Sequence, residues 1–537
     1  MTLIPTSNES RPISRSSFLL LFAILMAGAV IVRFLHLTHF PMHVHNDEAS
    51  TVTSGYGLVG KWTLFTVLSG SGFGGHPNFG FWLASLPSQL LGEQSLWTLR
   101  LSSAFIGSLS LLFFACFVAH AFGRGAALAF LLFAAPFHLH VHYSRTGFIY
   151  IHSLLLAGLM SWTWAIFVSR TTWVSAVLVG ITTGLGLLVY PTTQVLPLAM
   201  LCAAVCGVMP MTATVRTIWR HPGTLAGLLV AFLAGVLLSF GPQISYIYHH
   251  GFLSRAGSTF VLQPHNIRHI SSVMREPSAS HVEILWFNFL QTLRFFFSAD
   301  SGEQYNFVES PLPWWSIPMI IAGVWVLLSR CLRRDPISLY LLAVAGMTLG
   351  ASALMVEANF SPHLIMFALL LPLALAIGMI SLLNAMKGTT TLRCLRMVVV
   401  VLTVVVWPWW NWDYYNRVVD PLRPRIFSTE TRLINLPIDT QAVHSIFNIS
   451  GYRINFEEST VQLVFPNARG STKRLDKAPE VVSHLLSSDE LPSVVLVDVE
   501  QAGEIQSAIQ SSGIVTRRFD YPQLAISFLH VQRRGTE

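Results

Sequence analysis

The chain has 537 residues, of which 53% are hydrophobic and 11% charged, and its formal net charge at pH 7 is +7. Soluble globular proteins carry about 25% charged residues, so this composition excludes a soluble enzyme and indicates a polytopic membrane protein. The positive charge includes no basic run with interleaved aromatic residues, which argues against a nucleic-acid-binding module. The five cysteines lack the spacing of a zinc site or of a disulfide framework, and we assign them no chemistry.

Apolar segments of spanning or near-spanning length recur between residues 18 and 410. The first, residues 18–35, is long and lacks a small-residue cleavage site, so it predicts a retained first span and not a signal peptide. The other candidate spans are residues 101–119, 126–141, 148–168, 173–189, 195–209, 225–246, 314–328, 337–356, 364–383 and 398–410. The sequence therefore predicts an α-helical polytopic membrane protein with about eleven transmembrane helices within residues 18–412.

Basic residues predict the orientation of these spans. If residues 1–17 are cytoplasmic, the short connections on the cytoplasmic side carry the basic clusters, as the positive-inside rule requires. These residues are Arg124, Arg170, Arg216, Arg220, Arg330, Arg333, Arg334, Lys387, Arg393 and Arg396. The apolar segment 79–91 is too short to cross a bilayer, and we expect it at the outer interface. The outer side then receives the loops 36–96 and 247–313.

Residues 413–537 have the composition of a soluble domain. Strand-like runs alternate there with helical patterns, which predicts a small extracytoplasmic α/β domain. The expected strands are residues 442–449, 460–465, 494–499 and 524–531, and the expected helices are residues 479–487 and 500–511.

An adjacent acid pair, Asp47 and Glu48, follows the first span. A carboxylate at the membrane surface can act as a general base toward a hydroxyl whose reaction partner is lipid-linked. The alternative interpretation is a solvated loop in which Asp47 caps a helix.

Two arginines lie near the outer ends of apolar segments on the same side as the acid pair. Arg100 precedes the second span and Arg145 follows the third. A guanidinium group in this position is costly unless it meets an anion, and it suits phosphate oxygens well. The alternative is that each side chain extends to the aqueous interface. Together with the acid pair, the two arginines favour a phosphate site.

Two further features allow more than one interpretation. His138, His140 and His142 alternate at the end of the third span, but only His138 and His142 would share a helical face, so interfacial histidines are favoured over a metal site. Residues 282–297 are rich in aromatic side chains, including Trp286. They predict either a segment that lies on the membrane and lines an opening for a lipid tail or simple packing against the helices.

Six short motifs carry a resemblance to a known family. They are Asp47-Glu48, His76-Pro77, the Leu99–Ala104 segment, Tyr143-Ser144-Arg145-Thr146-Gly147, the stretch from Gly184 to Tyr190 followed by Pro191, and Ser361-Pro362-His363. In their order and spacing, residues 18–412 resemble the GT-C glycosyltransferases that use polyprenyl-phosphate sugars. The resembling branch holds the protein O-mannosyltransferases and the bacterial aminoarabinose transferases, families 39 and 83.

The resemblance implies roles for individual residues. Asp47 matches the proposed catalytic base and Glu48 its neighbour, while Arg100 and Arg145 match basic positions near the carrier phosphate. His76 stands where some relatives have a lysine, which implies a phosphate contact that depends on protonation. Many relatives have an acidic residue shortly after the Ser-Arg motif, and this chain has none in residues 148–153. The candidates for an acceptor or lipid site are Tyr190, His363 and Trp286.

These features predict an inverting transfer of one sugar from a polyprenyl-phosphate donor to an acceptor hydroxyl on the extracytoplasmic face of a bacterial inner membrane. The acceptor would be a protein, lipid or glycan. No cofactor is expected and a divalent metal is not favoured, because the chain has neither a glycine-rich phosphate loop nor a convincing metal cluster. A transporter or lipid flippase, and an inactive GT-C scaffold that only binds the lipid carrier, remain as alternatives.

Overall fold

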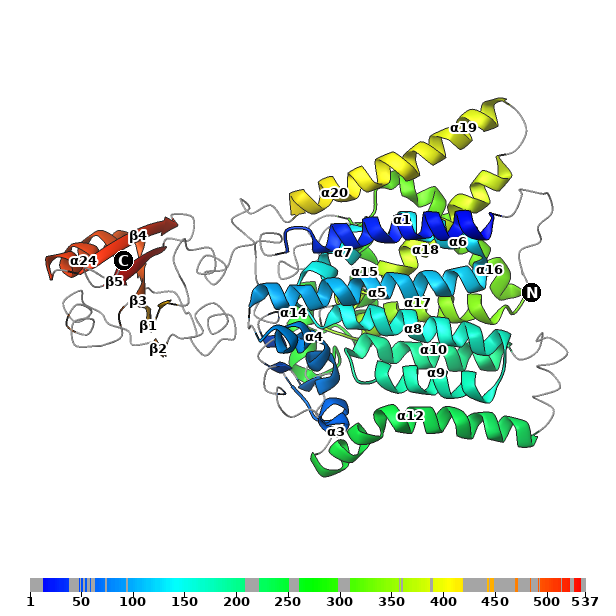
Figure 1. The fold of residues 1–537 in the computed structure, drawn as a ribbon, viewed down its shortest axis with the longest axis horizontal. Coiled ribbons are helices and arrows are strands. Elements are labelled where there is room, and N and C mark those ends of the chain that lie inside the picture. The colour runs from blue at the N-terminus through cyan, green and yellow to red at the C-terminus, as the bar shows by residue number, and fades with distance from the viewer. Residues whose placement is uncertain are drawn as a thin grey trace.

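The computed structural model describes residues 13–37, 222–250, 260–297 and 390–418 continuously, residues 48–207 and 310–386 with short gaps, and parts of 442–532. Asp47 lies outside the described residues. Helices dominate the part before residue 419, and most of them form one bundle (Figure 1). They are α1 (Arg15–Phe34), α5 (Leu96–Phe122), α6 (Arg124–Ala134), α7 (His138–Arg145), α8 (Tyr150–Ser169), α9 (Trp173–Gly186), α10 (Val195–Gly207), α12 (Pro222–His250), α16 (Ile317–Leu332), α17 (Pro336–Ala353), α18 (Phe367–Ala385), α19 (Thr390–Val401) and α20 (Trp407–Val418).

The candidate spans of the sequence correspond to helices. In the described part of the chain, eight helices are long and apolar enough to cross a membrane, and the shorter apolar helices α9 and α10 match two further candidates. The segment expected as one span over residues 126–141 is instead a pair, α6 and α7, bent by 68°. Pro136 lies in the break, where its ring and missing N–H disfavour a continuous helix. The polytopic helical fold is confirmed, with this span corrected to a broken one.

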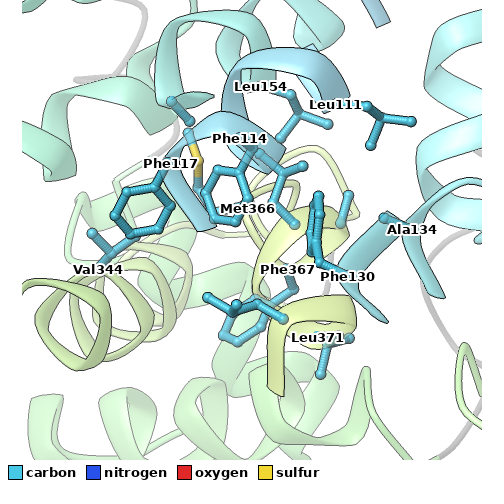
Figure 2. Packing of buried hydrophobic residues seen from close by; sticks show 14 of the residues in the cluster. Leu111, Phe114, Phe117, Phe130, Ala134, Leu154, Val344, Met366, Phe367 and Leu371 are labelled. Carbon is cyan, nitrogen blue, oxygen red and sulfur yellow. The ribbon is translucent and has the colours of Figure 1, made fainter. Parts of the chain in front are cut away.

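The core of the bundle consists of aromatic and aliphatic side chains from helices distant in sequence. Figure 2 shows Phe114 of α5 beside Phe130 of α6, with Phe367 of α18 nearby, and the rings of Phe114 and Phe130 have centroids 5.2 Å apart. Elsewhere α9 and α12 approach so closely that a β-carbon at Gly180 or Gly235 would collide with the backbone of the other helix. Small residues at such contacts are typical of helix packing in membranes, where close van der Waals contact drives association.

Short helices gather at one end of the bundle. They are α3 (Leu64–Leu68), α4 (Asn78–Leu91) and α14 (Pro264–Met274), at the end where α1 stops and α5 begins (Figure 1). We call this the loop end. At the opposite end Arg124 donates to the Ile13 carbonyl, and the Arg330 guanidinium lies over the Phe122 ring. This basic end holds connections that are short and rich in arginine.

The described part of the C-terminal region is a five-stranded mixed sheet in the order β2-β1-β3-β5-β4. The strands are β1 (Ser445–Asn448), β2 (Arg469–Ser471), β3 (Ser493–Asp498), β4 (Val515–Tyr521) and β5 (Ile526–Gln532), with α24 (Val499–Ser511) between β3 and β4. Apolar side chains of β3 and β5, such as Val495 and Leu529, pack against Ile505 and Ile509 of α24. The α/β fold is confirmed, whereas the expected strand 460–465 and most of the expected helix 479–487 lie outside the described residues.

Candidate active site

A buried ion pair joins Glu48 to the first turns of α5. The Arg100 Nε lies 2.8 Å from the Glu48 Oε1, and both side chains are 0% exposed. The backbone N–H of Gly147 donates to the same carboxylate oxygen at 2.8 Å, and Arg100 also donates to the Leu37 carbonyl at 3.1 Å. Charge-assisted hydrogen bonds of this kind fix geometry as well as charge. The structure therefore brings together two sequence-predicted residues, Glu48 and Arg100, beside the segment that follows α7.

Gly147 is required for this arrangement. A β-carbon there would collide with the Leu99 side chain and lie 2.8 Å from the Glu48 Cγ. The Ser-Arg-Thr-Gly motif thus ends on a glycine because the backbone must approach the carboxylate closely.

Arg145 meets the backbone at the end of α1. It is buried, and its two terminal nitrogens donate to the carbonyls of Val32, Arg33, Leu35 and His36. The last carbonyls of a helix have no intrahelical partner, so a guanidinium group there acts as a cap. The side chain does not extend to the interface as the alternative interpretation supposed.

Arg33 was missed as a candidate residue. It lies in α1 with 0% exposure, and it donates to the Ala29 carbonyl at 2.8 Å, to the Ala135 carbonyl at 3.1 Å and to the His140 Nδ1 at 2.9 Å. A charged residue within a transmembrane segment is costly and commonly functional. An arginine inside the first candidate span, residues 18–35, was therefore a signal that the sequence contained.

The three alternating histidines have different partners. The His138 ring stacks on Tyr414 of α20 with centroids 4.0 Å apart, and its Nε2 lies 3.1 Å from the Pro311 carbonyl oxygen. His140 faces Arg33, whereas His142 packs edge-on against Tyr143, with ring centroids 5.3 Å apart. Among the described residues, no three histidine, cysteine or acidic side chains are grouped so that they could hold a metal ion. Each of the three alternating histidines thus contacts a different part of the bundle.

A row of ring side chains links α4, α7, α8 and the segments around them. The His76 and Tyr190 rings have centroids 5.3 Å apart, Tyr190 meets Tyr150 edge-on at 4.6 Å, and Tyr150 meets Tyr143 edge-on at 5.9 Å. The Tyr143 hydroxyl is hydrogen-bonded to the Ser361 hydroxyl at 2.6 Å. We call these four ring side chains, together with Ser361 at one end, the aromatic row.

The aromatic row contains two of the predicted residues, His76 and Tyr190, and ends two residues before a third, His363. Tyr150 was missed. Its position shortly after the Ser-Arg-Thr-Gly motif was the available signal.

Trp286 lies elsewhere. It is on α15 (His281–Arg294), is 60% exposed, and stacks on Phe289 of the same helix. The buried face of α15 carries Asn288, whose amide donates to the Met355 carbonyl at 2.8 Å. The structure therefore does not bring Trp286 to the ion pair or the aromatic row.

The start of α15 is fixed by a capping box between Ser280 and Glu283. Hydrogen bonds from the Ser280 backbone N–H and hydroxyl lower the pKa of the Glu283 carboxyl.

Comparisons with known proteins bear on this geometry. Residues 75–238, less than a third of the chain, match the family described as dolichyl-phosphate-mannose-protein mannosyltransferase. Two crystal structures of ArnT from Cupriavidus metallidurans, one bound to undecaprenyl phosphate and one in the apo state, are similar with a TM-score of 0.53. Their identity to this chain is 13% and 12%, over 96% of this chain and 98% of theirs. No curated protein matches the sequence.

The chain thus shares the fold of ArnT over nearly its whole length, and residues 75–238 match the mannosyltransferase family model. The matched segment contains Arg100 and Arg145, the aromatic-row residues from His76 to Tyr190, and Gly147. The fold shared with ArnT covers 96% of this chain, so it extends over both the bundle and the C-terminal region. The buried ion pair and the aromatic row are therefore the candidate active site.

Proposed function

We propose that the protein is a membrane glycosyltransferase of the GT-C class, which moves one sugar from a polyprenyl-phosphate donor to an acceptor hydroxyl at the loop end of the bundle, with Asp47 as the general base. A similar solved structure, that of ArnT, holds undecaprenyl phosphate, which supports a carrier of this class. The matched family is described by its use of dolichyl-phosphate-mannose, which supports a lipid-linked monosaccharide. The proposal covers the class of donor and leaves the sugar and the acceptor open.

The observation that carries the proposal is the anchoring of Glu48. Its carboxylate is bonded to Arg100 and to the Gly147 N–H, so it is neutralised and held in place. Both carboxylate oxygens already accept hydrogen bonds within the protein, Oε1 from Arg100 and Gly147 and Oε2 from Arg100. Asp47 directly precedes Glu48 in the chain. We therefore assign the base to Asp47 and a positioning role to Glu48.

Buried positive charge supports a site for the carrier phosphate. In the described part of this region, the guanidinium groups of Arg33, Arg100 and Arg145 are all buried and the Glu48 carboxylate pairs with Arg100. Even with Asp47 ionised, the five groups together carry a net positive charge. Such a region attracts an anion and stabilises charge that develops on a leaving phosphate. His76, at the end of the aromatic row, is the further candidate for a phosphate contact.

In the proposed reaction, Asp47 takes the proton of the acceptor hydroxyl as its oxygen attacks the anomeric carbon. The bond between that carbon and the phosphate oxygen breaks at the same time, and the phosphate leaves with the electron pair. A single displacement inverts the anomeric configuration. In this proposal no metal or nucleotide is needed, because the donor already carries an activated sugar and the buried arginines supply a positive potential near the leaving phosphate.

The orientation follows from the distribution of charge. Arg124 begins α6, Arg170 directly follows α8 and Arg330 lies in the last turn of α16, all at the basic end, which the positive-inside rule assigns to the cytoplasm. The loop end, with Glu48 and α4, is then extracytoplasmic. We propose a bacterial inner membrane, with the N-terminus in the cytoplasm and the C-terminal α/β domain outside.

The test compares the wild type with Asp47→Asn in detergent with added lipid. A panel of polyprenyl-phosphate monosaccharides is offered with membrane extract as the acceptor source, and the loss of sugar from the carrier is measured. Asp413→Asn is the matched control, because Asp413 forms an exposed pair with Arg417 on α20. We expect turnover by the wild type and the control, and a loss of at least about 100-fold in Asp47→Asn with carrier binding retained.

Two results would overturn parts of the proposal. Unchanged turnover in Asp47→Asn would remove Asp47 from the mechanism. Tight binding of carrier without turnover of any donor would instead favour the inactive scaffold that binds lipid carrier.

A further inference from the structure

Helices α1 and α7 exchange buried arginines. The Arg33 side chain leaves α1 and donates to the Ala135 carbonyl at the bend before α7, and to the His140 Nδ1 on α7. In return, the Arg145 side chain leaves α7 and donates to four carbonyls at the end of α1. Each helix is thus held by a guanidinium group from the other. We call Arg33, His140 and Arg145 the arginine clamp.

His140 links the clamp to α5. Its Nδ1 accepts a hydrogen bond from the Arg33 guanidinium at 2.9 Å. The ring proton therefore sits on Nε2, which lies 2.9 Å from the Ser110 hydroxyl oxygen. Both His140 and Ser110 are 0% exposed. A buried guanidinium group that loses an acceptor cannot recover the hydrogen bond from water, so this contact fixes the position of Arg33.

The clamp lies directly between two parts of the candidate active site. On one side, the end of α1 precedes the segment that carries the acid pair, and the Leu37 carbonyl accepts from Arg100. On the other side, α7 ends at Arg145, two residues before Gly147, whose N–H holds Glu48. The distance between the end of α1 and the end of α7 therefore sets how the Glu48 carboxylate meets both Arg100 and Gly147.

We infer that Arg33 is a positioning residue, which acts with His140 and Arg145 to hold Glu48 at the correct distance from the Gly147 segment. This role rests on the proposed function, because it concerns the geometry in which the base meets the acceptor. Loss of the Arg33–His140 contact lowers kcat and leaves the KM for the lipid-linked donor nearly unchanged, since this contact joins two protein side chains and its loss leaves the three buried positive charges in place. Displacing a reacting group by about 1 Å costs on the order of 100-fold in rate.

Two amide variants of His140 show whether its hydrogen bond with Arg33 matters or only the volume of its side chain. In His140→Asn the amide oxygen occupies the place of Nδ1 and can still accept from Arg33. In His140→Gln the amide lies near the place of Nε2 and can reach Ser110, but Arg33 loses its side-chain acceptor on α7 and keeps only the Ala29 and Ala135 carbonyls. His120→Gln is the matched control, because the His120 Nε2 is bonded to the Ser169 hydroxyl at the basic end. We expect kcat to fall at least about tenfold more in His140→Gln than in His140→Asn.

A second measurement does not depend on turnover. Hydrogen exchange of the backbone amides in residues 143–150 reports whether the Gly147 N–H stays bonded to Glu48. We expect faster exchange in His140→Gln and in Arg33→Met than in His140→Asn, His120→Gln and the wild type. Wild-type protein that turns over no donor would refute the proposed function. The exchange data would still show whether the clamp keeps the Gly147 N–H bonded to Glu48.

Equal losses in the two His140 variants, with equal exchange, would overturn the inference. A loss that appears in the KM for the donor and not in kcat would overturn it as well.

Discussion

Replacing Glu48 by alanine removes the carboxylate that Arg100 contacts in the interior of the bundle. Both side chains are 0% exposed, and the Nε–Oε1 distance is 2.8 Å. Removing one partner of such a pair leaves an uncompensated buried charge and costs about 3–5 kcal/mol. The Gly147 N–H loses its acceptor as well, and a buried donor left without an acceptor costs about 1–3 kcal/mol. We count this cost as part of the roughly 3–5 kcal/mol and do not add it. We therefore expect a decrease of about 3–5 kcal/mol in the free energy of unfolding.

The assay is a double-mutant cycle with Glu48→Ala, Arg100→Ala and the double variant, each unfolded by a denaturing detergent in mixed micelles and followed by tryptophan fluorescence. If the two side chains stabilise each other, the double variant loses less than the sum of the single variants by about 1–3 kcal/mol. The control cycle uses Asp413 and Arg417, which are 41% and 45% exposed and whose coupling should not exceed about 1 kcal/mol. A Glu48–Arg100 coupling as small as that of the control would refute the assignment of Glu48 as an anchor.

Three further predictions follow from single contacts. Gly147→Ala should lower kcat by at least about tenfold with donor binding retained, because a β-carbon collides with its neighbours; a normal kcat would contradict the close approach. Tyr143→Phe should decrease the free energy of unfolding by about 1 kcal/mol through loss of the bond to Ser361, and an effect no larger in the wild type than in a Ser361→Ala background would show that the bond contributes nothing. Burial, assisted by Arg517, lowers the pKa of His530, so the unfolded chain binds its proton more tightly. The C-terminal sheet should therefore lose stability as pH falls below about 6.5. His530→Gln should weaken this pH dependence, which is measured by amide exchange of β5 at pH 5 and pH 8. An unchanged pH dependence in the variant would show that another group causes it.

The transmembrane helices were predictable because their signal is local. Length and hydropathy are properties of a short segment, and each candidate span corresponds to a described helix or pair of helices. The break between α6 and α7 was also encoded locally, by Pro136, but an uninterrupted apolar run conceals it. Strand β4 escaped for a different reason: it is an edge strand with Arg517, Arg518 and Asp520, and charged edges interrupt the apolar pattern that identifies strands.

The candidate site was predictable only in part. Sequence order alone placed Glu48, Arg100 and Arg145 on the same side of the membrane, and the structure brings Glu48 and Arg100 into contact. The partners of Arg145 were not predictable, because backbone carbonyls at the end of α1 are not visible as a motif. The arginine exchange also required the distance between α1 and α7, since Arg33 and His140 are separated by 107 positions in the chain. Contacts of this kind depend on tertiary packing and leave no local pattern.

The most direct test of the central claim is a stoichiometric measurement of transfer. Wild-type protein is incubated with a polyprenyl-phosphate monosaccharide and acceptor extract, and the free polyprenyl phosphate and the transferred sugar are quantified together, alongside Asp47→Asn and Asp413→Asn. The account predicts one polyprenyl phosphate released for each sugar transferred by the wild type and by Asp413→Asn, and neither product above background in Asp47→Asn despite retained carrier binding. Transfer by Asp47→Asn at the wild-type rate would contradict the account.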